Sequence, residues 1–390
     1  MRALVVAPQP FFTPRGTPFS VYHRTRIAAS LGVDIDFLTY GEGRDVDLPG
    51  VRLIRIPRIK LLEPVRVGPS FPKLVLDVLM VLWTIALLLR RRYDFVHAHE
   101  EAVFWCSFLQ PLFRFKLVYD MHSSLPQQLT NFGFTESRLL IGTFQRLERF
   151  ALRRAAAVLT ISPALAEYAC SHPGVESRHL LIENSLFEPV RFREPEEPGE
   201  APPADSHVPR GVPVIGYAGT FEAYQGIDLL ILAHARLLET IPEAILLLVG
   251  GSPAQVARSR ELAQALNIDE ACLFTGTVPQ TAAQALMARA SVVVSPRTRG
   301  TNTPLKIYEI LSRDVPLVAT DIPSHTQVLS QENCFLAQPE PDAFAEALVE
   351  ALEDEAGRRR VLQGAHRLYS TRYSPERYEA KMRLLLDLVG

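Results

Sequence analysis

Two runs of alternating apolar segments and helical stretches constrain the fold of this chain more than any other feature. Short apolar runs at residues 3–8, 34–40, 51–57, 94–99, 116–121 and 157–162 predict strands, and helical stretches such as 18–31 and 136–156 lie between them. The pattern restarts with strands at 213–219, 244–251, 271–277, 291–296 and 316–321 and helices near 226–239, 254–266 and 304–312. Because continuous apolar strands alternating with helices are buried on both faces, the sequence predicts an α/β protein with two parallel, doubly wound sheets.

A change in composition divides the two runs. Residues 188–211 are rich in proline and acid and nearly lack large apolar side chains, which is typical of a linker. We expect an N-terminal Rossmann-like domain at 1–187, a linker at 188–211, a C-terminal Rossmann-like domain at 212–365, and helices at 366–390 that pack back toward the first domain. Ligands of open α/β sheets bind beyond the carboxyl ends of the strands, so we expect a cleft where two such domains face each other.

Charge and cysteine content exclude several classes of protein. The 390 residues carry 41 basic and 43 acidic side chains, whereas a protein that wraps nucleic acid is usually more basic. The four cysteines lie far apart and form no C-x-x-C pair, so a zinc ribbon or a dense disulfide framework is not expected. The N-terminal apolar run is too short for a signal peptide. These features predict a cytoplasmic protein without a nucleic-acid partner.

One apolar stretch, at residues 74–89, allows three interpretations. It contains Asp77 and is followed by Arg90, Arg91 and Arg92, and the wider segment 51–92 holds nine basic side chains against two acidic ones. The stretch is slightly short for a membrane span of about 20 residues. It is compatible with a buried helix of an α/β domain, with a helix that rests on the inner face of an anionic membrane, or with a transmembrane helix.

The segment 295–312 carries the richest local signal. Thr303 and Pro304 are typical of a helix N-cap followed by proline in the first helical position. Ile307, Ile310 and Leu311 follow at the spacing of a buried helix face.

Polar residues around that helix indicate two alternative roles. Arg297, Arg299 and Lys306 near a helix N-terminus would suit a diphosphate, and Glu309, one turn further along, can accept hydrogen bonds from a ribose diol. The other interpretation is a surface ion pair between Lys306 and Glu309 on an ordinary helix.

Signals for a metal site are weak. His97 and His99 alternate on one predicted strand and so point to the same side, but two histidines alone rarely define a metal site. The Asp-x-Asp triplets at 34–36 and 45–47 lie at a strand start and in a loop, and we interpret them as solvated acids. We expect no metal and no other cofactor.

Six segments in order give the chain a resemblance that spans nearly its whole length. NTPLKIYEILSRDVPLVATD resembles the C-terminal motif of GT-B glycosyltransferases of family 4, in their P-x-K-x-x-E branch. YAGTFEAYQGIDLLILAHARL resembles the start of that family's C-terminal domain, and FVHAHEE, VYDMHSS, AVLTISPAL and LIENS resemble its N-terminal landmarks. The resemblance implies retaining transfer of a sugar from a nucleotide diphosphate donor to a glycan or lipid-linked acceptor, without a metal. Together with the basic segment, it suggests cell-surface polysaccharide or glycolipid synthesis.

The donor site implied by the resemblance departs from the family pattern at two places. Glu309 matches the glutamate that holds the donor ribose, but Thr301 stands where the first glutamate of the motif is expected. Backbone groups near Asn302 and Thr303, beside Pro304 and Leu305, would then take over the contact with the donor sugar.

The family's basic pair is also missing, because Gln225 stands where its lysine is expected. We expect Arg297 and Lys306 to replace that pair, with help from Arg299 or Arg15. Thr220 and Gly250 are implied as further donor contacts.

In the N-terminal domain, the resemblance implies that Gly16 lets the backbone approach the phosphate and the acceptor. Arg15 is a candidate contact with acceptor or phosphate, or else an exposed arginine in a plain turn. His122 would lie beside the transferred sugar, unless it is a structural histidine bonded to Asp120 or a serine. His99 and Glu100 are placed on the acceptor side, where Glu100 or the adjacent Glu101 would be a base toward an acceptor hydroxyl or simply a solvated acid.

Three other functions remain open at this point. A nucleotide-sugar epimerase of the same fold would convert the donor without any acceptor. The departures at Thr301 and Gln225 also fit a non-catalytic protein that binds nucleotide sugars. Residues 74–89 leave room for a membrane-embedded assembly component.

Overall fold

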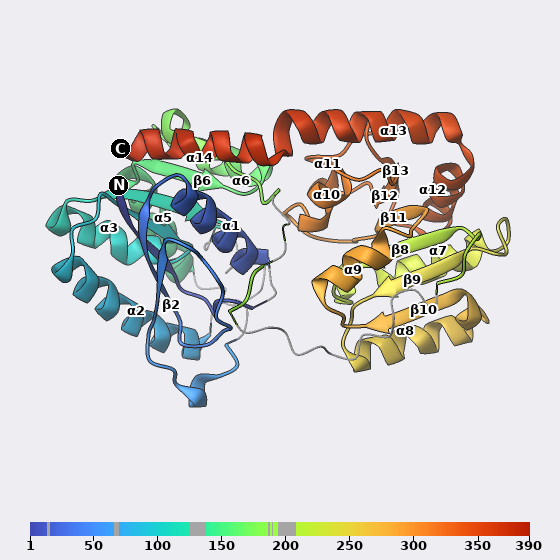
Figure 1. Ribbon diagram of the computed structural model, residues 1–390, viewed down its shortest axis with the longest axis horizontal. Coiled ribbons are helices and arrows are strands. Elements are labelled where there is room, and N and C mark those ends of the chain that lie inside the picture. The colour runs from blue at the N-terminus through green and yellow to red at the C-terminus, as the bar shows by residue number, and fades with distance from the viewer. Residues whose placement is uncertain (14–15, 66–69, 125–137, 186–187, 189, 194–207) are drawn as a thin grey trace. The chain divides into compact units, whose positions relative to one another are not determined.

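The computed structural model consists of two compact units, each built on its own parallel sheet (Figure 1). The first unit comprises Met1–Pro195 and Pro375–Gly390, and the second comprises Glu196–Ser374. The structure describes residues 1–13, 16–65, 70–124, 138–185, 188, 190–193 and 208–390. Much of the expected linker at 188–211 therefore lies outside the described residues.

The first unit has a seven-stranded sheet in the order β3-β2-β1-β4-β5-β6-β7, with every pairing parallel. The strands are β1 (Arg2–Ala7), β2 (Asp34–Thr39), β3 (Val51–Arg55), β4 (Phe95–His99), β5 (Lys116–Met121), β6 (Ala157–Thr160) and β7 (His179–Leu181). Its helices are α1 (Gly16–Ser30), α2 (Phe71–Arg90), α3 (Ala102–Phe113), α5 (Arg138–Arg154), α6 (Pro163–Cys170) and α14 (Pro375–Val389).

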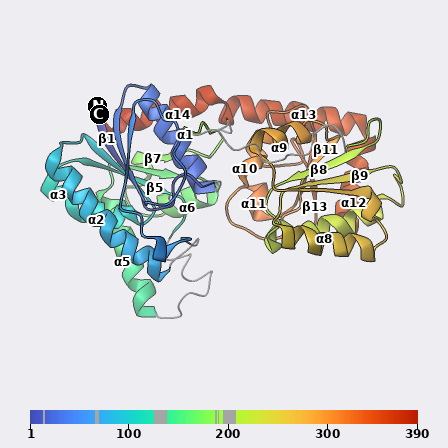
Figure 2. The ribbon, with the colours of Figure 1, turned by 60° about the horizontal axis from the view of Figure 1, so that its bottom comes forward.

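Two apolar layers cover the first sheet, one on each face. Residues of α2, α3, α5 and α6 pack with alternate strand positions such as Val6 and Val96, whereas residues of α1 and α14 pack with the intervening positions such as Val5. Figure 2 shows α1 and α14 on the side of this sheet opposite α2, α3 and α5. Burial on both faces explains why its strands are continuously apolar.

The second unit has a six-stranded parallel sheet in the order β10-β9-β8-β11-β12-β13. The strands are β8 (Val214–Ala218), β9 (Ile245–Val249), β10 (Cys272–Gly276), β11 (Val292–Ser295), β12 (Leu317–Thr320) and β13 (Phe335–Ala337). The helices are α7 (Ile227–Leu237), α8 (Pro253–Ala265), α9 (Gln280–Met287), α10 (Leu305–Ile310), α11 (Pro323–Thr326), α12 (Pro341–Glu353) and α13 (Glu355–Leu368). The predicted α/β class with two doubly wound sheets is confirmed.

Helix α2 is neither fully buried nor free of the protein. Its side with Leu76, Met80 and Leu87 belongs to the core of the first unit, although the helix is long and apolar enough to cross a membrane by length and composition. Asp77, the acidic residue of this helix, accepts a 2.5 Å hydrogen bond from the Tyr40 hydroxyl.

One smaller expectation about charged residues was wrong. Asp36 is not a solvated acid, because it is buried, accepts two hydrogen bonds from Arg52 and receives a third from Tyr93 at 2.6 Å. The basic character of segment 51–92 is also partly neutralised, since Arg55 pairs with Asp45 and other basic side chains pair with Glu63 and Glu101.

Candidate functional site

In the second unit the strand order reverses between β8 and β11, and open α/β sheets bind ligands beyond the carboxyl ends of strands at such a point. Strand β8 ends there at Ala218 and is followed by Gly219, and β9 ends beside it at Val249 and is followed by Gly250. The Gly219 amide donates to the Val249 carbonyl at 2.9 Å. Gly250 has φ 117°, and a Cβ there would collide with the Gly219 carbonyl oxygen. The chain therefore needs glycine where these two strands end.

Lys306, on helix α10, extends to this strand end. Its Nζ lies 3.8 Å from the centre of the Tyr217 ring and 3.4 Å from the Ala218 carbonyl oxygen, to which it donates. Burial, aided by the positive charge of Arg297, lowers the pKa of the Lys306 ammonium to about 7. The side chain is thus held at the switch point at a cost to its charged form.

Arg297 follows β11 and supplies the second positive charge. Its Nη1 donates to the Asn302 carbonyl at 2.9 Å, and its guanidinium lies 5.2 Å from the centre of the Tyr224 ring. Burial lowers the pKa of Arg297, and its Nε is buried without a hydrogen-bond partner.

Neither cation has a counter-charge in the part of the chain that the structure describes. Among the described residues, no carboxylate forms an ion pair with Arg297 or Lys306. Two adjacent, partly desolvated cations form a positive site, and a bound anion would reduce the repulsion between them. Charge-assisted hydrogen bonds to a diphosphate are strong.

The alternative of a surface pair between Lys306 and Glu309 is wrong. Glu309 Oε1 instead lies 2.5 Å from Arg313 Nη2 and accepts a 3.1 Å hydrogen bond from the Gln284 amide. With its charge paired and one oxygen fixed, Glu309 is held in a defined position. Its role toward a ribose stays a prediction.

The capping prediction for this helix was also wrong by one residue. Helix α10 begins at Leu305, and its N-cap is Pro304, whose φ and ψ of −60° and 134° are extended. Thr303 lies one position earlier, and its buried Oγ1 has no hydrogen-bond partner. Ile307, with its neighbours Ile310 and Leu311, is buried as expected.

The loop between Arg297 and Leu305 is held from β12 and α11, which the sequence analysis missed. Thr320 donates to the Arg297 carbonyl, and Gln327 donates to the Thr301 carbonyl at 3.0 Å. His325, buried and hydrogen-bonded to Ser295 at 2.9 Å, supports the end of β11. In the sequence, these contacts were indicated only by the polar residues that end the apolar run at 317–321.

The remaining predicted donor residues lie around the same strand ends. Thr220 is exposed directly after Gly219, and its carbonyl accepts a 2.7 Å hydrogen bond from the Tyr217 hydroxyl. Asn302 offers its carbonyl to Arg297, and Arg299 is exposed. The structure thus brings most of the predicted donor residues to one edge of the second sheet.

The first unit has its own switch point between β1 and β4, and a buried polar cluster lies on β4 and β5 beside it. In the register of β4 and β5, Asp120 stands opposite His99. The Asp120 carboxylate forms a buried ion pair with Arg24. His97 Nε2 lies 2.9 Å from the Asp120 carboxylate and His99 Nδ1 lies 3.2 Å from it. Arg24 and the histidines hold the pKa of Asp120 well below its usual range, against the effect of burial.

His122 joins this cluster. Its Nε2 lies 3.2 Å from His99 Nδ1 and 3.4 Å from Asp120 Oδ1. Burial lowers the pKa of His122 to about 4 and holds the pKa of His99 well below its usual value, so both rings are neutral at pH 7. His99 Nε2 is buried without a hydrogen-bond partner.

The ligand atoms of His97, His99 and Asp120 lie within 4.8 Å of one another, which is close enough for a metal ion. However, the same carboxylate is bonded to the guanidinium of Arg24, and a second cation there would be repelled. The cluster is better suited to orienting its histidines than to binding a metal.

Glu100 follows β4 in a left-handed conformation, with φ 49°. Its amide donates to the Asp120 carbonyl at 3.1 Å. Burial raises the pKa of Glu100 to about 7, with Glu101 and Asp120 adding repulsion. Glu101 is instead paired with Lys73 at 2.5 Å, whereas Glu100 has no ion pair among the described residues.

Gly16 is exposed at the start of α1, after β1, where the backbone approach was predicted. Arg15 lies outside the described residues, so its predicted contact is not assessed.

Comparison with known proteins agrees with this geometry. Residues 201–367 match the family model described as "Glycosyl transferases group 1", and residues 16–185 match that of the "Glycosyl transferase 4-like domain".

Two relatives share part of the sequence. A 2-deoxystreptamine N-acetyl-D-glucosaminyltransferase of Streptomyces fradiae is 28% identical over 320 residues, which is 74% of this chain and 70% of that protein. A 2-deoxystreptamine glucosyltransferase of Streptomyces kanamyceticus is 25% identical over 300 residues, 71% of this chain and 73% of that protein.

Solved structures share the fold along the whole chain. HepE of Anabaena in complex with UDP aligns with a TM-score of 0.73 at 17% identity, covering 99% of this chain and 100% of that one. The lipopolysaccharide glycosyltransferase WaaG aligns with a TM-score of 0.66 at 14% identity and covers 100% of both chains. With both halves matched by family models and both sheets matched by fold, the chain belongs to the group 1 (family 4) glycosyltransferases of the GT-B fold, which transfer sugars from nucleotide-sugar donors.

Proposed function

We propose that this protein is a retaining glycosyltransferase whose second unit binds a nucleoside diphosphate sugar and whose first unit binds the acceptor. The observation that carries the proposal is the pair Arg297 and Lys306 at the switch point of the second sheet, two cations for which the described residues supply no acidic partner. A diphosphate supplies the negative charge that this place lacks.

The transfer breaks the bond between the donor's anomeric carbon and its β-phosphate oxygen and forms a bond from the same face to an acceptor oxygen. Arg297 and Lys306 stabilise the negative charge that develops on the departing diphosphate. Glu100, whose pKa is raised to about 7 by burial, accepts the proton of the acceptor hydroxyl. His122, neutral at pH 7, hydrogen-bonds a hydroxyl of the transferred sugar.

For the donor, UDP is the first nucleotide to test. HepE, which shares the fold, has been solved with UDP and with UDP-glucose. The two streptomycete relatives are named for transfer of N-acetylglucosamine and glucose.

For the acceptor, we infer a small polyhydroxylated ring. The two streptomycete relatives are named for 2-deoxystreptamine. A third relative, 28% identical over 177 residues (43% of this chain and 41% of that protein), is named as a D-inositol 3-phosphate glycosyltransferase of Corynebacterium urealyticum. The carboxyl of Glu100 can bind a ring hydroxyl or an amino group. A glycan or lipid-linked acceptor of the cell surface is the second candidate, favoured by the exposed apolar side of α2.

The test is a transfer assay with UDP-glucose and UDP-N-acetylglucosamine against 2-deoxystreptamine, an inositol phosphate and a lipid-linked sugar. We expect a product with one of these acceptors, with the anomeric configuration of the donor retained in its proton NMR spectrum. Conversion of the donor without any acceptor would indicate an epimerase. Donor binding without turnover in all mixtures would indicate a non-catalytic protein, and an inverted product would refute the retaining mechanism.

A further inference from the structure

Helix α2 carries an apolar stripe that no described residue of the first unit covers. Its members are spaced three, four, four and seven residues apart, which places them on the side opposite the buried face of the helix. They are Phe71, Leu74, Val78, Leu82 and Leu89, with exposed fractions of 75%, 62%, 57%, 54% and 72%. Single exposed apolar residues are ordinary, but a stripe along a whole helix indicates an interaction surface.

The stripe continues onto the neighbouring helix. Helix α3 packs against both α2 and α5, and Figure 2 shows the three running along the same face of the first sheet. Phe108 and Leu112 of α3 are also exposed, and the Phe108 ring stacks on Phe150 of α5 at 5.0 Å. We call the exposed side of these three helices the α2–α3–α5 face.

Positive charge borders this face, and the acids of its helices point elsewhere. The exposed charged residues of α2, α3 and residues 141–154 of α5 are all arginines, namely Arg90, Arg146, Arg149, Arg153 and Arg154. Each carboxylate on these described segments is engaged away from solvent: Asp77 with Tyr40 and Glu148 with Ser124 and Tyr168. Glu101, which precedes α3, is paired with Lys73.

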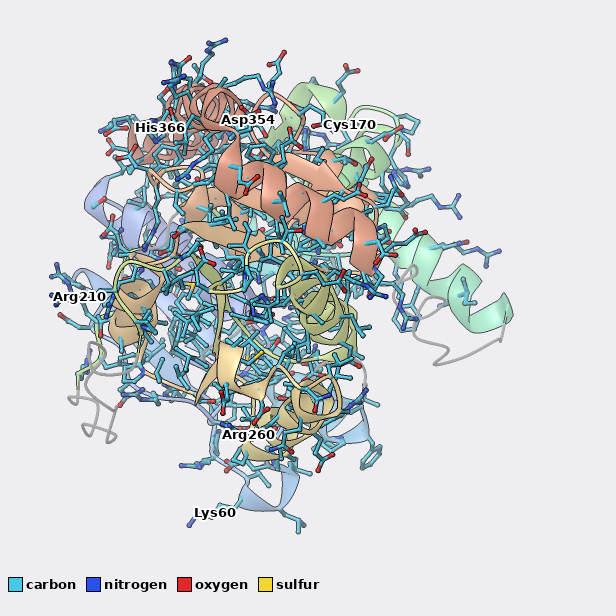
Figure 3. The ribbon with its side chains drawn as sticks, turned by 90° about the vertical axis from the view of Figure 1, so that its right-hand side faces the viewer. Lys60, Cys170, Arg210, Arg260, Asp354 and His366 are labelled. Atoms are coloured by element: carbon cyan, nitrogen blue, oxygen red, sulfur yellow. The ribbon has the colours of Figure 1, made fainter. Side chains whose placement is uncertain are left out.

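A short turn adds to the same character. The short 3-10 helix η1 (Lys60–Leu62) packs through Leu62 on the same core as α2, while Leu61 is 92% exposed. In Figure 3 the Lys60 side chain points outward from this turn.

We propose that the α2–α3–α5 face docks the first unit on the surface of an anionic lipid bilayer. Apolar side chains enter the headgroup region while the arginines meet lipid phosphates, which is how basic amphipathic helices bind membranes. This proposal goes beyond sugar transfer and requires neither the donor site nor turnover.

Two other occupants fit less well. A span through the bilayer would pull the Leu76–Leu87 side of α2 out of the core and break the hydrogen bond from Trp105 Nε1 to Thr84 Oγ1 at 3.4 Å. A second copy of the chain would bring one arginine-bordered face against another, without exposed acids on the described parts of these helices to pair with them.

The experiment is co-sedimentation of the full chain with vesicles of phosphatidylcholine alone or with phosphatidylglycerol added. Two double variants test the two components: Leu74→Gln with Leu82→Gln, and Arg149→Gln with Arg153→Gln. All four side chains are exposed, so folding should be kept, and the melting temperature checks this. The matched control is Arg359→Gln with Arg360→Gln, two exposed arginines of α13 in the second unit.

We expect the wild type and the α13 control to co-sediment with the anionic vesicles and to remain in the supernatant with the neutral vesicles. Removing two arginines should weaken binding about 30-fold, because each is worth about fivefold near an anionic surface. Removing two leucines should weaken it at least tenfold. The proposal is overturned if the wild type does not bind anionic vesicles, if either variant binds like the control, or if light scattering shows that the leucine variant abolishes a dimer without changing vesicle binding.

Discussion

Replacing Lys306 by methionine should move stability and donor binding in opposite directions. Lowering a lysine pKa from 10.5 to about 7 means that the charged form costs the folded protein about 5 kcal/mol relative to the unfolded chain. At pH 7, where about half of the folded molecules carry the charge, the net penalty is about 4 kcal/mol as an upper bound. Methionine keeps most of the volume and the contact with the Tyr217 ring but carries no charge, so Lys306→Met should stabilise the free protein.

The pH dependence has a definite sign. Since the unfolded chain holds this proton more tightly than the folded protein between pH 7 and 10.5, stability rises with pH in that window. From pH 7 to pH 9 this lysine alone should add about 2 kcal/mol to the free energy of unfolding, and the rise should be absent in Lys306→Met.

Donor binding should respond in the opposite way. A diphosphate restores the charge of Lys306, so its loss should weaken UDP binding about 10- to 100-fold, which corresponds to a charge-assisted hydrogen bond of about 1.5–3 kcal/mol. Urea unfolding at pH 7 and pH 9 measures the change in stability, and isothermal titration with UDP measures the change in donor affinity. A variant that is less stable than the wild type at pH 7, or that binds UDP equally well, would refute the reasoning.

Three further substitutions test other parts of the account. Arg24→Leu leaves the buried Asp120 without its guanidinium and should cost about 3–5 kcal/mol, seen as a lower midpoint in urea. Gly250→Ala places a methyl group against the Gly219 carbonyl at a positive φ. It should lower the free energy of unfolding by about 1–3 kcal/mol and weaken UDP binding. Unchanged UDP titration curves would count against the site at these strand ends. Glu100→Gln should lower kcat about 10²- to 10⁴-fold and remove the rise of kcat/KM with pH through about 7, because the base acts only when deprotonated; a pH–rate profile that keeps this rise would exclude Glu100 as the base.

The sequence was sufficient to predict the fold because the strands are buried on both faces. Runs such as 3–8 and 291–296 are apolar on both faces over most of their length, and the structure places strands there. The three-residue strand β13 was not predicted, because Phe335–Ala337 is too short to show a period.

The candidate site was predictable only in part. Position after a strand was enough to single out Arg297, and helical spacing placed Lys306 near it. The partner of Glu309 could not be read from spacing, because Arg313 at i+4 and Lys306 at i−3 both lie within reach, and the burial of Lys306 against Tyr217 decided between them. The ion pair of Arg24 and Asp120 joins residues 96 positions apart, so only the parallel sheet brings them together.

The central claim is that Arg297 and Lys306 bind the diphosphate of a nucleotide donor. It is tested most directly by isothermal titration of UDP and UMP into the wild type, Arg297→Gln and Lys306→Met, with Arg258→Gln on α8 as a matched surface control. The account predicts that the wild type and the control bind UDP at least about tenfold more tightly than UMP, and that each site variant loses most of this preference. Equal preference for UDP in all four proteins would contradict it.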